Sequence, residues 1–349
     1  MLTGLFVIFS ILIVFSFTED YLGKYKWLIF IIIGLTLILY AGFRPVGFDQ
    51  DSPNYEAFFM HPDSKESAIS VEPTFLWICN FGAIILQDVR IVLLIFAIIG
   101  VTIKLLAIKK SSPILFLPLV IYFGNFYYLH ELTQIRAGIA AAFFLLALPY
   151  QAEGKKTFAL ILVLLACSFH YSAFVLLPFL LCGNKAIGGK MKIAITAIVP
   201  LCFVLYALNL DLLTNVPIPY VSAKIEAYKM ASEYGNIEKN SILNPFPIIR
   251  IAVLLFTLYY SETIAKYEPY IYLYIKVMVC SLLIYFALSS ITIVSTRFFE
   301  LFGIVEIVAY PCIIYAIKPR VIGKLFVCII AVIEMIFNTI IWDFFDFSV

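Results

Sequence analysis

The chain has 349 residues, of which 63% are hydrophobic and 13% are charged, and its formal net charge is +2. A soluble domain carries roughly twice that charged fraction, so the composition excludes a soluble globular protein. A net charge this small gives no reason to expect a nucleic-acid partner. The sequence contains no Walker loop, no Rossmann glycine motif and no zinc-protease or serine-hydrolase motif, which argues against a nucleotide-driven pump.

Apolar runs long enough to cross a bilayer recur from end to end. They predict an all-α, polytopic integral membrane bundle of about 10–12 crossings, with possible re-entrant segments, in a single domain, 1–349. The predicted crossings are 2–17, 27–43, 91–108, 113–129, 134–150, 193–208, 247–260, 270–288, 297–317 and 325–342. The first run lacks the basic start and small-residue cleavage site of a signal peptide, so it is predicted to be a retained helix.

Two apolar stretches do not fit a single crossing. Residues 73–86 would form only about 21 Å of helix, and residues 158–182 are interrupted by the polar sequence Cys-Ser-Phe-His-Tyr-Ser. Lysine clusters in short loops are predicted to face the cytoplasm, whereas the acidic loops 44–72 and 209–246 are predicted to face outward. These sides agree only if 73–86 dips in and returns, and if 158–182 forms a tight hairpin or a re-entrant segment with His170 near its apex. If each stretch crossed once instead, two lysine pairs would be exported.

The outer loop 209–246 contains a pattern typical of a helix that lies on a membrane surface. Val221, Ile225 and Tyr228 share one helical face, and Lys224 and Lys229 lie off it. The segment serves either as a surface tether or as a lid over a site.

Five of the six arginines fall at the predicted outer end of a crossing, namely Arg44, Arg90, Arg136, Arg250 and Arg297. The sixth, Arg320, is predicted to lie on the cytoplasmic side. Cationic residues near the membrane cost insertion energy, on the order of 2–3 kcal/mol each at a helix centre. Because the guanidinium group binds phosphate through two parallel hydrogen bonds, the five arginines predict a pocket for a phosphate- or pyrophosphate-bearing lipid. The alternative is that each arginine reaches the interface or pairs with a nearby acid.

The three histidines, His61, His130 and His170, map to the same outer side, and histidine is the most common general base near neutral pH. His170 lies between two apolar arms and is the first candidate, with a hydrogen-bonded structural histidine as the alternative. His130, close to Arg136 in the sequence, is the second. His61 is expected to be solvated.

Asp49 and Asp51 follow Arg44 closely. They could bind a metal, act as a base or hold the arginine in an ion pair, and a structural role or one in binding sugar hydroxyl groups is favoured. A third metal ligand is not recognisable, and the seven cysteines all lie in apolar stretches without a Cys-x-x-Cys pair. No metal and no cofactor are therefore expected.

Four short motifs occur in a characteristic order: FRPVGFDQDSPNYEAFF, TQIRAGIAAAFFLLAL, ACSFHYSAFVLLP and STRFFELF. Together they resemble the EpsG family of bacterial polysaccharide-synthesis membrane proteins, which is related to Wzy-type O-antigen and capsule polymerases. By position, the resemblance assigns functional roles to Arg44, Gly47, Asp49, Asn54, Tyr55, Arg136, His170, Ser172 and Arg297. The chain departs from the family pattern at Ala137, where the family has glutamine, so Gln134 becomes the candidate side-chain amide.

The resemblance implies a membrane glycosyltransferase in the bacterial cytoplasmic (inner) membrane. Such an enzyme moves a glycan from undecaprenyl pyrophosphate onto the next lipid-linked repeat unit at the outer face, without a metal or other cofactor. The catalytic residues implied are His170, Arg136, Arg297 and Asp49. The predicted substrate-binding residues are Arg44, Tyr55, Asn54 and Gln134, from the motifs, and Arg90, Arg250 and His130, from the arginine and histidine patterns. The lipid bilayer and other polysaccharide-export membrane proteins are the expected partners.

Three other functions fit the same residues less well. A polyprenyl-linked-sugar glycosyltransferase or ligase would share the arginines and the first-loop aspartate but use a single lipid-linked donor. A lipid-linked oligosaccharide flippase or other transporter should carry charges through the full membrane depth, whereas only Glu306 and Glu334 are predicted to lie deep. A membrane acyltransferase would carry its histidine and arginine nearer the amino end.

Overall fold

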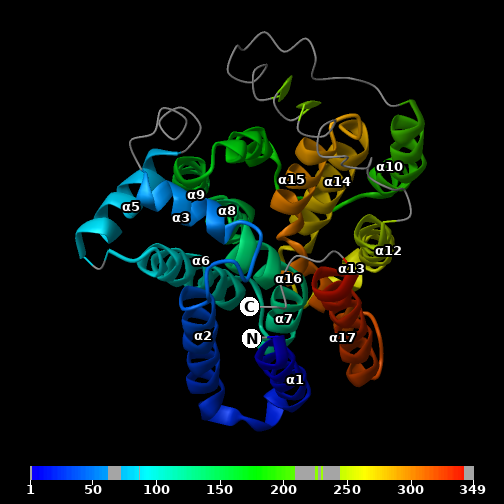
Figure 1. Ribbon diagram of the computed structural model, residues 1–349. Coiled ribbons are helices and arrows are strands. Elements are labelled where there is room, and N and C mark those ends of the chain that lie inside the picture. The colour runs from blue at the N-terminus through cyan, green and yellow to red at the C-terminus, as the bar shows by residue number, and fades with distance from the viewer. Residues whose placement is uncertain are drawn as a thin grey trace. The chain divides into compact units, whose positions relative to one another are not determined.

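The computed structural model describes residues 2–61, 72–85, 87–208, 225–226, 229–230 and 244–341, and their regular secondary structure is helical (Figure 1). Within these ranges, seven helices are long and apolar enough to cross a membrane, and five further apolar helices have 10–17 residues. The predicted all-α polytopic fold is therefore confirmed. The C-terminal tail and most of the outer loop 209–246, including most of its predicted amphipathic helix, lie outside the described residues.

Most predicted crossings coincide with one helix each. These helices are α1 (Leu2–Thr18), α2 (Lys26–Gly42), α6 (Arg90–Ser111), α8 (Ile135–Ala152), α10 (Gly189–Leu208), α12 (Pro245–Tyr259), α14 (Ile271–Ala287) and α17 (Arg320–Ile336). Two predicted crossings are composite: α7 (Phe116–Ile121) continues as a π-helix, Tyr122–Thr133, and α15 (Thr292–Gly303) is followed by α16 (Glu306–Ala309) and a 3₁₀ helix, Tyr310–Tyr315. Shorter helices are α3 (Ser52–Met60), α5 (Pro73–Ile85), α9 (Lys156–Phe169) and α13 (Ser261–Ile264).

Contacts between Cα atoms divide the chain into two compact units, one comprising Met1–Gly183 with Tyr310–Val349 and the other Asn184–Ala309. In the first unit, α8 packs against both α6 and α9, α2 lies against α6, and α17 lies against α7 and the π-helix. In the second unit, α14 packs against α10, α12 and α15. The single domain expected from the sequence stays a prediction.

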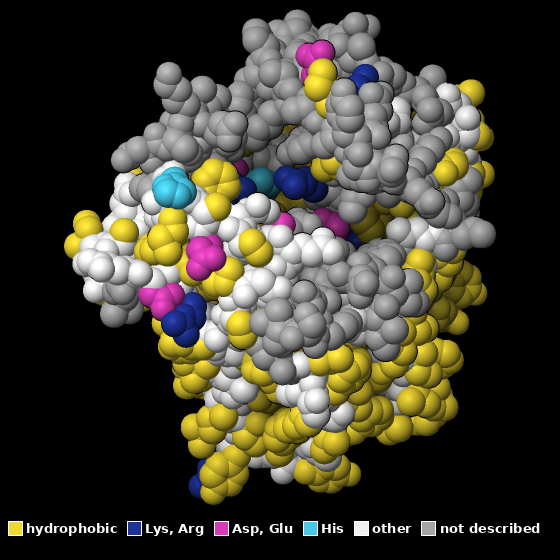
Figure 2. Space-filling model, in the orientation of Figure 1, with side chains coloured by type: hydrophobic (Ala, Val, Ile, Leu, Met, Phe, Trp, Pro, Cys, Tyr) yellow, Lys and Arg dark blue, Asp and Glu magenta, His cyan; other side chains and the backbone are white. Residues whose placement is uncertain are grey.

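One side of α2 is an exposed apolar surface. Its exposed side chains include Leu28, Ile31, Ile32, Leu35 and Leu39, and Figure 2 shows that hydrophobic side chains cover most of the surface over this helix. Soluble monomers rarely expose apolar surface on this scale, so this side of the helix is suited to contact with lipid.

The first unit owes its close packing to the small residues of α8. Ala140, Ala141 and Ala142 are fully buried, and a Cβ added at Gly138 would lie 2.6 Å from the backbone oxygen of His130. Small residues let membrane helices approach closely. The N-terminal turn of α8 is therefore held directly against the π-helix.

The polar interruption at His170 is the turning point of a hairpin. Helix α9 ends before His170, whose backbone is extended, and two short 3₁₀ helices then pack back against α9. At the far end, the Gln151 side chain in the last turn of α8 donates hydrogen bonds to the backbone oxygens of Phe179 (2.8 Å) and Cys182 (2.6 Å). Both ends of the hairpin thus lie at the same end of α8, which confirms the predicted hairpin and places His170 near its apex.

A buried ion pair, which the sequence did not indicate, ties three helices of the first unit together. Lys104 of α6 places Nζ 2.5 Å from Oε1 of Glu131 in the π-helix and 2.9 Å from the backbone oxygen of Gly138. The Tyr122 hydroxyl donates to the same carboxylate oxygen. Because both charges are almost fully buried, removing either one would leave the other uncompensated.

A buried carboxyl group in the second unit predicts a pH-dependent stability. Glu268 is 1% exposed between α13 and α14, and burial raises its pKa from 4.5 to about 8. Because the folded state holds the proton more tightly than the unfolded state, the stability from Glu268 is fully present below about pH 4.5 and is lost as the pH rises through about 8. The thermal midpoint of the detergent-solubilised protein should therefore fall across this window, and Glu268→Gln should flatten the fall. An unchanged slope in the variant would contradict this prediction.

Candidate active site

Glu72, immediately before α5, joins two residues that the sequence predicted to be catalytic. Its Oε2 atom lies 2.5 Å from Nη1 of Arg136, and its Oε1 atom lies 2.8 Å from Nδ1 of His170. The backbone N–H of Tyr171 donates to the same Oε1 atom at 3.2 Å. The Glu72 side chain is 1% exposed, whereas those of Arg136 and His170 keep 23% and 13% of their surface accessible. The cluster therefore consists of a buried carboxylate that holds a cation and an imidazole, both of which are partly accessible at the protein surface.

Three segments converge on this cluster. Because α8 and α9 pack against each other and are joined by a short turn, the first turn of α8, with Arg136, meets the end of α9, with His170. The Thr74 hydroxyl of α5 donates to the backbone oxygen of Ser168 at 2.5 Å, which fastens α5 to the end of α9. The guanidinium carbon of Arg136 lies 5.3 Å from the ring centre of Phe75 in α5, within the range of a cation–π contact.

The electrostatics of Glu72 determine which nitrogen of the neutral His170 ring carries the proton. Burial alone would raise the pKa of the Glu72 carboxyl, but the hydrogen bond from His170 and the positive charge of Arg136 lower it to about 2. An ionised carboxylate only accepts hydrogen bonds, so the proton resides on Nδ1 of His170 and the neutral ring keeps its lone pair on Nε2. In serine-protease triads, a buried carboxylate orients the imidazole in the same way for its work as a base.

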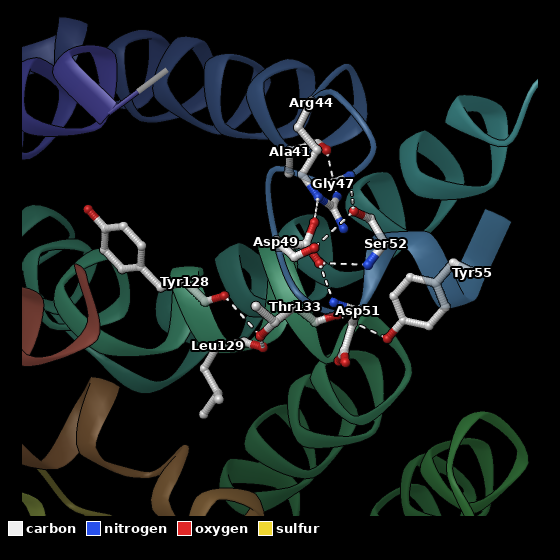
Figure 3. Close-up of polar contacts among 10 residues, drawn as sticks. All are labelled: Ala41, Arg44, Gly47, Asp49, Asp51, Ser52, Tyr55, Tyr128, Leu129 and Thr133. Carbon is white, nitrogen blue, oxygen red and sulfur yellow. Dashed lines mark hydrogen bonds and ion pairs between the residues drawn. The ribbon is translucent and has the colours of Figure 1, made fainter. Parts of the chain in front are cut away.

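Arg44 and Asp49 form a second, fully buried ion pair (Figure 3). Nε of Arg44 donates to Oδ2 of Asp49 at 2.8 Å, and Nη1 donates to the backbone oxygen of Ala41 at the same distance. Oδ1 of Asp49 accepts the backbone N–H groups of Asp51 and Ser52, at 3.1 and 2.9 Å. Of the roles considered for Asp49, the structure shows the ion pair with Arg44.

The loop that carries this ion pair also positions α3. Gly47 has a φ of +88°, a conformation that residues with a side chain rarely adopt, and its N–H donates to the Ser52 hydroxyl at the start of α3. Further along α3, the Tyr55 hydroxyl donates to the backbone oxygen of Thr133 at 2.9 Å, just before α8. Tyr55 thereby holds α3 close to Arg136, while Asn54 is exposed on the same helix.

Breaking the buried pair should destabilise the protein rather than block chemistry directly. Replacing one partner of a buried ion pair costs on the order of 3–5 kcal/mol, so Asp49→Asn should lower the thermal midpoint of the solubilised protein markedly. Asp88→Asn, which breaks the exposed pair of Asp88 with Arg90, is the matched control and should change the midpoint little. An Asp49→Asn protein with an unchanged midpoint but no activity would instead place Asp49 in the reaction.

The remaining arginines differ in their surroundings. Arg250 is 1% exposed, and its guanidinium group bonds to Glu306 at 2.5 Å, to the Ser281 hydroxyl and to the backbone oxygen of Phe299 at 2.9 Å. Arg297, also in the second unit, is exposed on α15. Arg44 and Arg250 are both fully buried, whereas Arg136 and Arg297 keep accessible surface. That the five arginines line a substrate pocket stays a prediction.

The other predicted site residues lie near the start of α8. His130, in the π-helix, is 1% exposed with its ring 5.4 Å from that of Phe126, and its Nδ1 atom has no hydrogen-bond partner among the described residues. Gln134 is half-buried at the N-cap position of α8. Burial makes His130 a poorer base than His170, and the roles of both His130 and Gln134 stay predictions.

The sequence did not single out Glu72, which counted only as one of six acids in the loop 44–72. The local sequence does mark this acid, because it directly precedes a proline that opens a short apolar helix. It does not indicate which residues the acid would contact. Among the residues that the structure describes, no group of three or more His, Cys, Asp or Glu side chains is placed to hold a metal ion.

Comparison with known proteins identifies the family. The EpsG family model matches residues 27–346. The amylovoran biosynthesis protein AmsC of Erwinia amylovora is 24% identical over 164 residues, a region that covers 43% of this chain and 44% of that protein. The match thus spans less than half the length of this relative, and no solved structure matches the chain. Because the family model covers most of the sequence, the chain belongs to the EpsG family.

Proposed function

We propose that this protein is a polysaccharide polymerase of the bacterial cytoplasmic membrane. It transfers a glycan from undecaprenyl pyrophosphate onto a hydroxyl group of the next lipid-linked repeat unit at the outer face. The observation that carries the proposal is the cluster of Arg136, Glu72 and His170, in which a cation and an oriented imidazole share one buried carboxylate. Membership of the EpsG family and the similarity to a protein of amylovoran biosynthesis support it.

In this reaction the acceptor hydroxyl attacks the anomeric carbon of the donor glycan. Nε2 of His170 takes the hydroxyl proton as the new glycosidic bond forms, because Nδ1 is engaged with Glu72. The bond from the anomeric carbon to the pyrophosphate oxygen breaks, and its electron pair leaves with the lipid pyrophosphate. The proton then passes from His170 to solvent or to the departing phosphate.

Arg136 stabilises the charge that develops on the leaving pyrophosphate. Of its guanidinium nitrogens, only Nη1 is hydrogen-bonded within the part of the chain that the structure describes, to Glu72, so the other N–H groups can face a ligand. Electrostatic stabilisation by oriented donors is commonly the largest single contribution to such a reaction. Glu72 holds the guanidinium group in place before the substrate binds.

The test is a gel of the surface polysaccharide made by a host from which the gene has been removed and then restored. Loss of the gene should collapse the ladder of polymer lengths to a single repeat unit on its anchor, and the wild-type gene should restore the ladder. If even the single repeat unit disappears, the protein acts earlier, as a glycosyltransferase or a flippase, and the polymerase proposal is wrong.

A further inference from the structure

A pocket of about 420 Å³ lies beside α3, and none of Glu72, Arg136 and His170 lines it. Its lining includes Val46, Glu56, Met60, Gln87, Asp88 and Arg90. Acidic and basic side chains lie next to one another over this part of the surface, near the start of α6 (Figure 2). The volume falls within the range of about 300–1,000 Å³ that small-molecule sites occupy.

The charged groups of the pocket do not suit a phosphate. Nη2 of Arg90 lies 2.7 Å from Oδ2 of Asp88, and Nε lies 2.9 Å from the same oxygen, so the fork that would bind phosphate is already engaged by a carboxylate. Glu56 adds a second carboxylate, which gives these three groups a net negative charge. A pyrophosphate would meet repulsion here.

The same groups suit a sugar. Carboxylates accept hydrogen bonds from hydroxyl groups, the amide of Gln87 both donates and accepts, and the free N–H groups of a guanidinium donate. Met60 and Val46 add apolar surface for the C–H faces of a sugar ring. A pocket with several convergent polar groups on an apolar wall is the usual form of a site for a small polar ligand.

The pocket wall is held by local contacts. Oδ1 of Asp88 accepts the backbone N–H of Arg90 at 2.9 Å, and the backbone N–H of Gln87 donates to the carbonyl of Gly82 at 3.3 Å. Asp88 and Arg90 are therefore paired before a ligand arrives, and such preorganisation lowers the cost of binding.

The pocket and the candidate active site share α3. Glu56 and Met60 line the pocket, whereas the neighbouring residue Tyr55 points to another face of the helix and contacts the ring of Phe75, 5.7 Å away. The ring centre of Phe75 also lies 5.3 Å from the guanidinium carbon of Arg136. A glycan bound in the pocket would thus lie one short helix away from the reacting end of the substrate.

We propose that this pocket binds the oligosaccharide portion of a lipid-linked glycan, in uncharged or cationic form, as a subsite separate from the pyrophosphate position at Arg136. The proposal rests on the proposed function for the identity of the glycan. The main observation in its favour is that Glu56, Gln87 and the paired Asp88 and Arg90 line one cavity.

Binding of two probes to the purified protein in nanodiscs tests the subsite. The first probe is the repeat-unit oligosaccharide released from the host's lipid carrier by mild acid, and the second is inorganic pyrophosphate. Two variants alter the pocket: Glu56→Ala removes a carboxylate, and Met60→Trp fills the space from a position that is 57% exposed and therefore tolerant of a larger side chain. Glu262→Gln, an exposed glutamate paired with Lys192 in the second unit, is the matched control.

Glu56→Ala and Met60→Trp should each weaken oligosaccharide binding about tenfold or more, the loss expected for a hydrogen bond to a charged group. Pyrophosphate binding should not change in either variant, and Glu262→Gln should leave both probes unaffected. Oligosaccharide binding that is equal in all four proteins would overturn the subsite, as would pyrophosphate binding that Met60→Trp abolishes.

The outcomes separate the subsite from the proposed function, because the binding measurement requires no turnover. A protein that builds the polymer ladder but binds the oligosaccharide independently of Glu56 would retain the polymerase proposal and lose the subsite. A protein whose oligosaccharide binding depends on Glu56 and Met60, in a host whose ladder does not depend on the gene, would retain the subsite and lose the polymerase proposal.

Discussion

Arg136→Ala is expected to abolish polymer formation while the protein still inserts and folds. The variant removes the cation that we assign to the leaving pyrophosphate, and loss of one oriented electrostatic donor typically lowers kcat by about 10²–10³-fold. Arg136→Lys should recover part of the rate, because the ammonium group keeps the charge but loses the planar fork that binds phosphate through two hydrogen bonds. The measurement is the transfer of radiolabelled repeat units by the enzyme in nanodiscs, together with the polymer ladder of the host.

Arg320→Ala is the matched control for this experiment. Arg320 opens α17 and is exposed, and the sequence predicts it on the cytoplasmic side, so the variant should retain the wild-type ladder. If Arg136→Ala transfers repeat units at the wild-type rate, Arg136 is only an anchor for Glu72 and α5. The reaction would then need another cation, with Arg297 as the next candidate.

The sequence was sufficient to predict the membrane helices and the hairpin. Long apolar runs impose helices because a bilayer leaves backbone polar groups no other partner, and α1, α2 and α6 accordingly lie where the runs are. The break at His170 was visible because a polar segment interrupts an apolar stretch that is too long for one short helix and too polar for a clean crossing. Local patterns of this kind need no knowledge of distant partners.

The contacts among Glu72, Arg136 and His170 could not be predicted from local sequence patterns. Glu72 lies 64 residues from Arg136 and 98 residues from His170 in the sequence, and only the packing of α5, α8 and α9 brings them together. The resemblance to the family marked Arg136 and His170 but not the acid that connects them. A single sequence shows which residues carry charge, whereas their pairing is a property of the fold.

Burial distinguishes arginines that the sequence pattern groups together. Arg44 and Arg250 stand at the ends of apolar runs, as Arg136 does, so the pattern alone gives all three the same interpretation. Their environments differ, because Asp49 and Glu306 lie within hydrogen-bonding distance and each pair is enclosed by neighbouring helices. Intramembrane charges are frequently functional, but paired and enclosed charges such as these hold helices together.

Glu72→Gln is expected to lower kcat with little change in KM, because Glu72 orients His170 and Arg136 without contacting the substrate. An amide can donate as well as accept, so it no longer requires the proton to be on Nδ1 of His170, and it removes the negative charge beside Arg136. In serine proteases, replacing the buried carboxylate of the triad by an amide lowers kcat by about 10⁴-fold. A fall on the order of 10³-fold is expected here, because the arginine remains in the cluster.

The pH dependence separates this positioning role from a loss of folding. Because the pKa of Glu72 is lowered from 4.5 to about 2, its contribution to stability is present above about pH 4.5 and is lost as the pH falls through about 2. The free energy of unfolding of the wild-type protein should therefore fall as the pH is lowered between these values, and this pH dependence should be absent in Glu72→Gln. At neutral pH, Glu72→Gln should remain folded with its kcat greatly reduced. His170→Ala should lower kcat by a similar factor, and the double variant should lower kcat little further than either single variant. A double variant whose losses multiply would show that Glu72 and His170 act independently, and the Glu72–His170 pair would not be the base of the reaction.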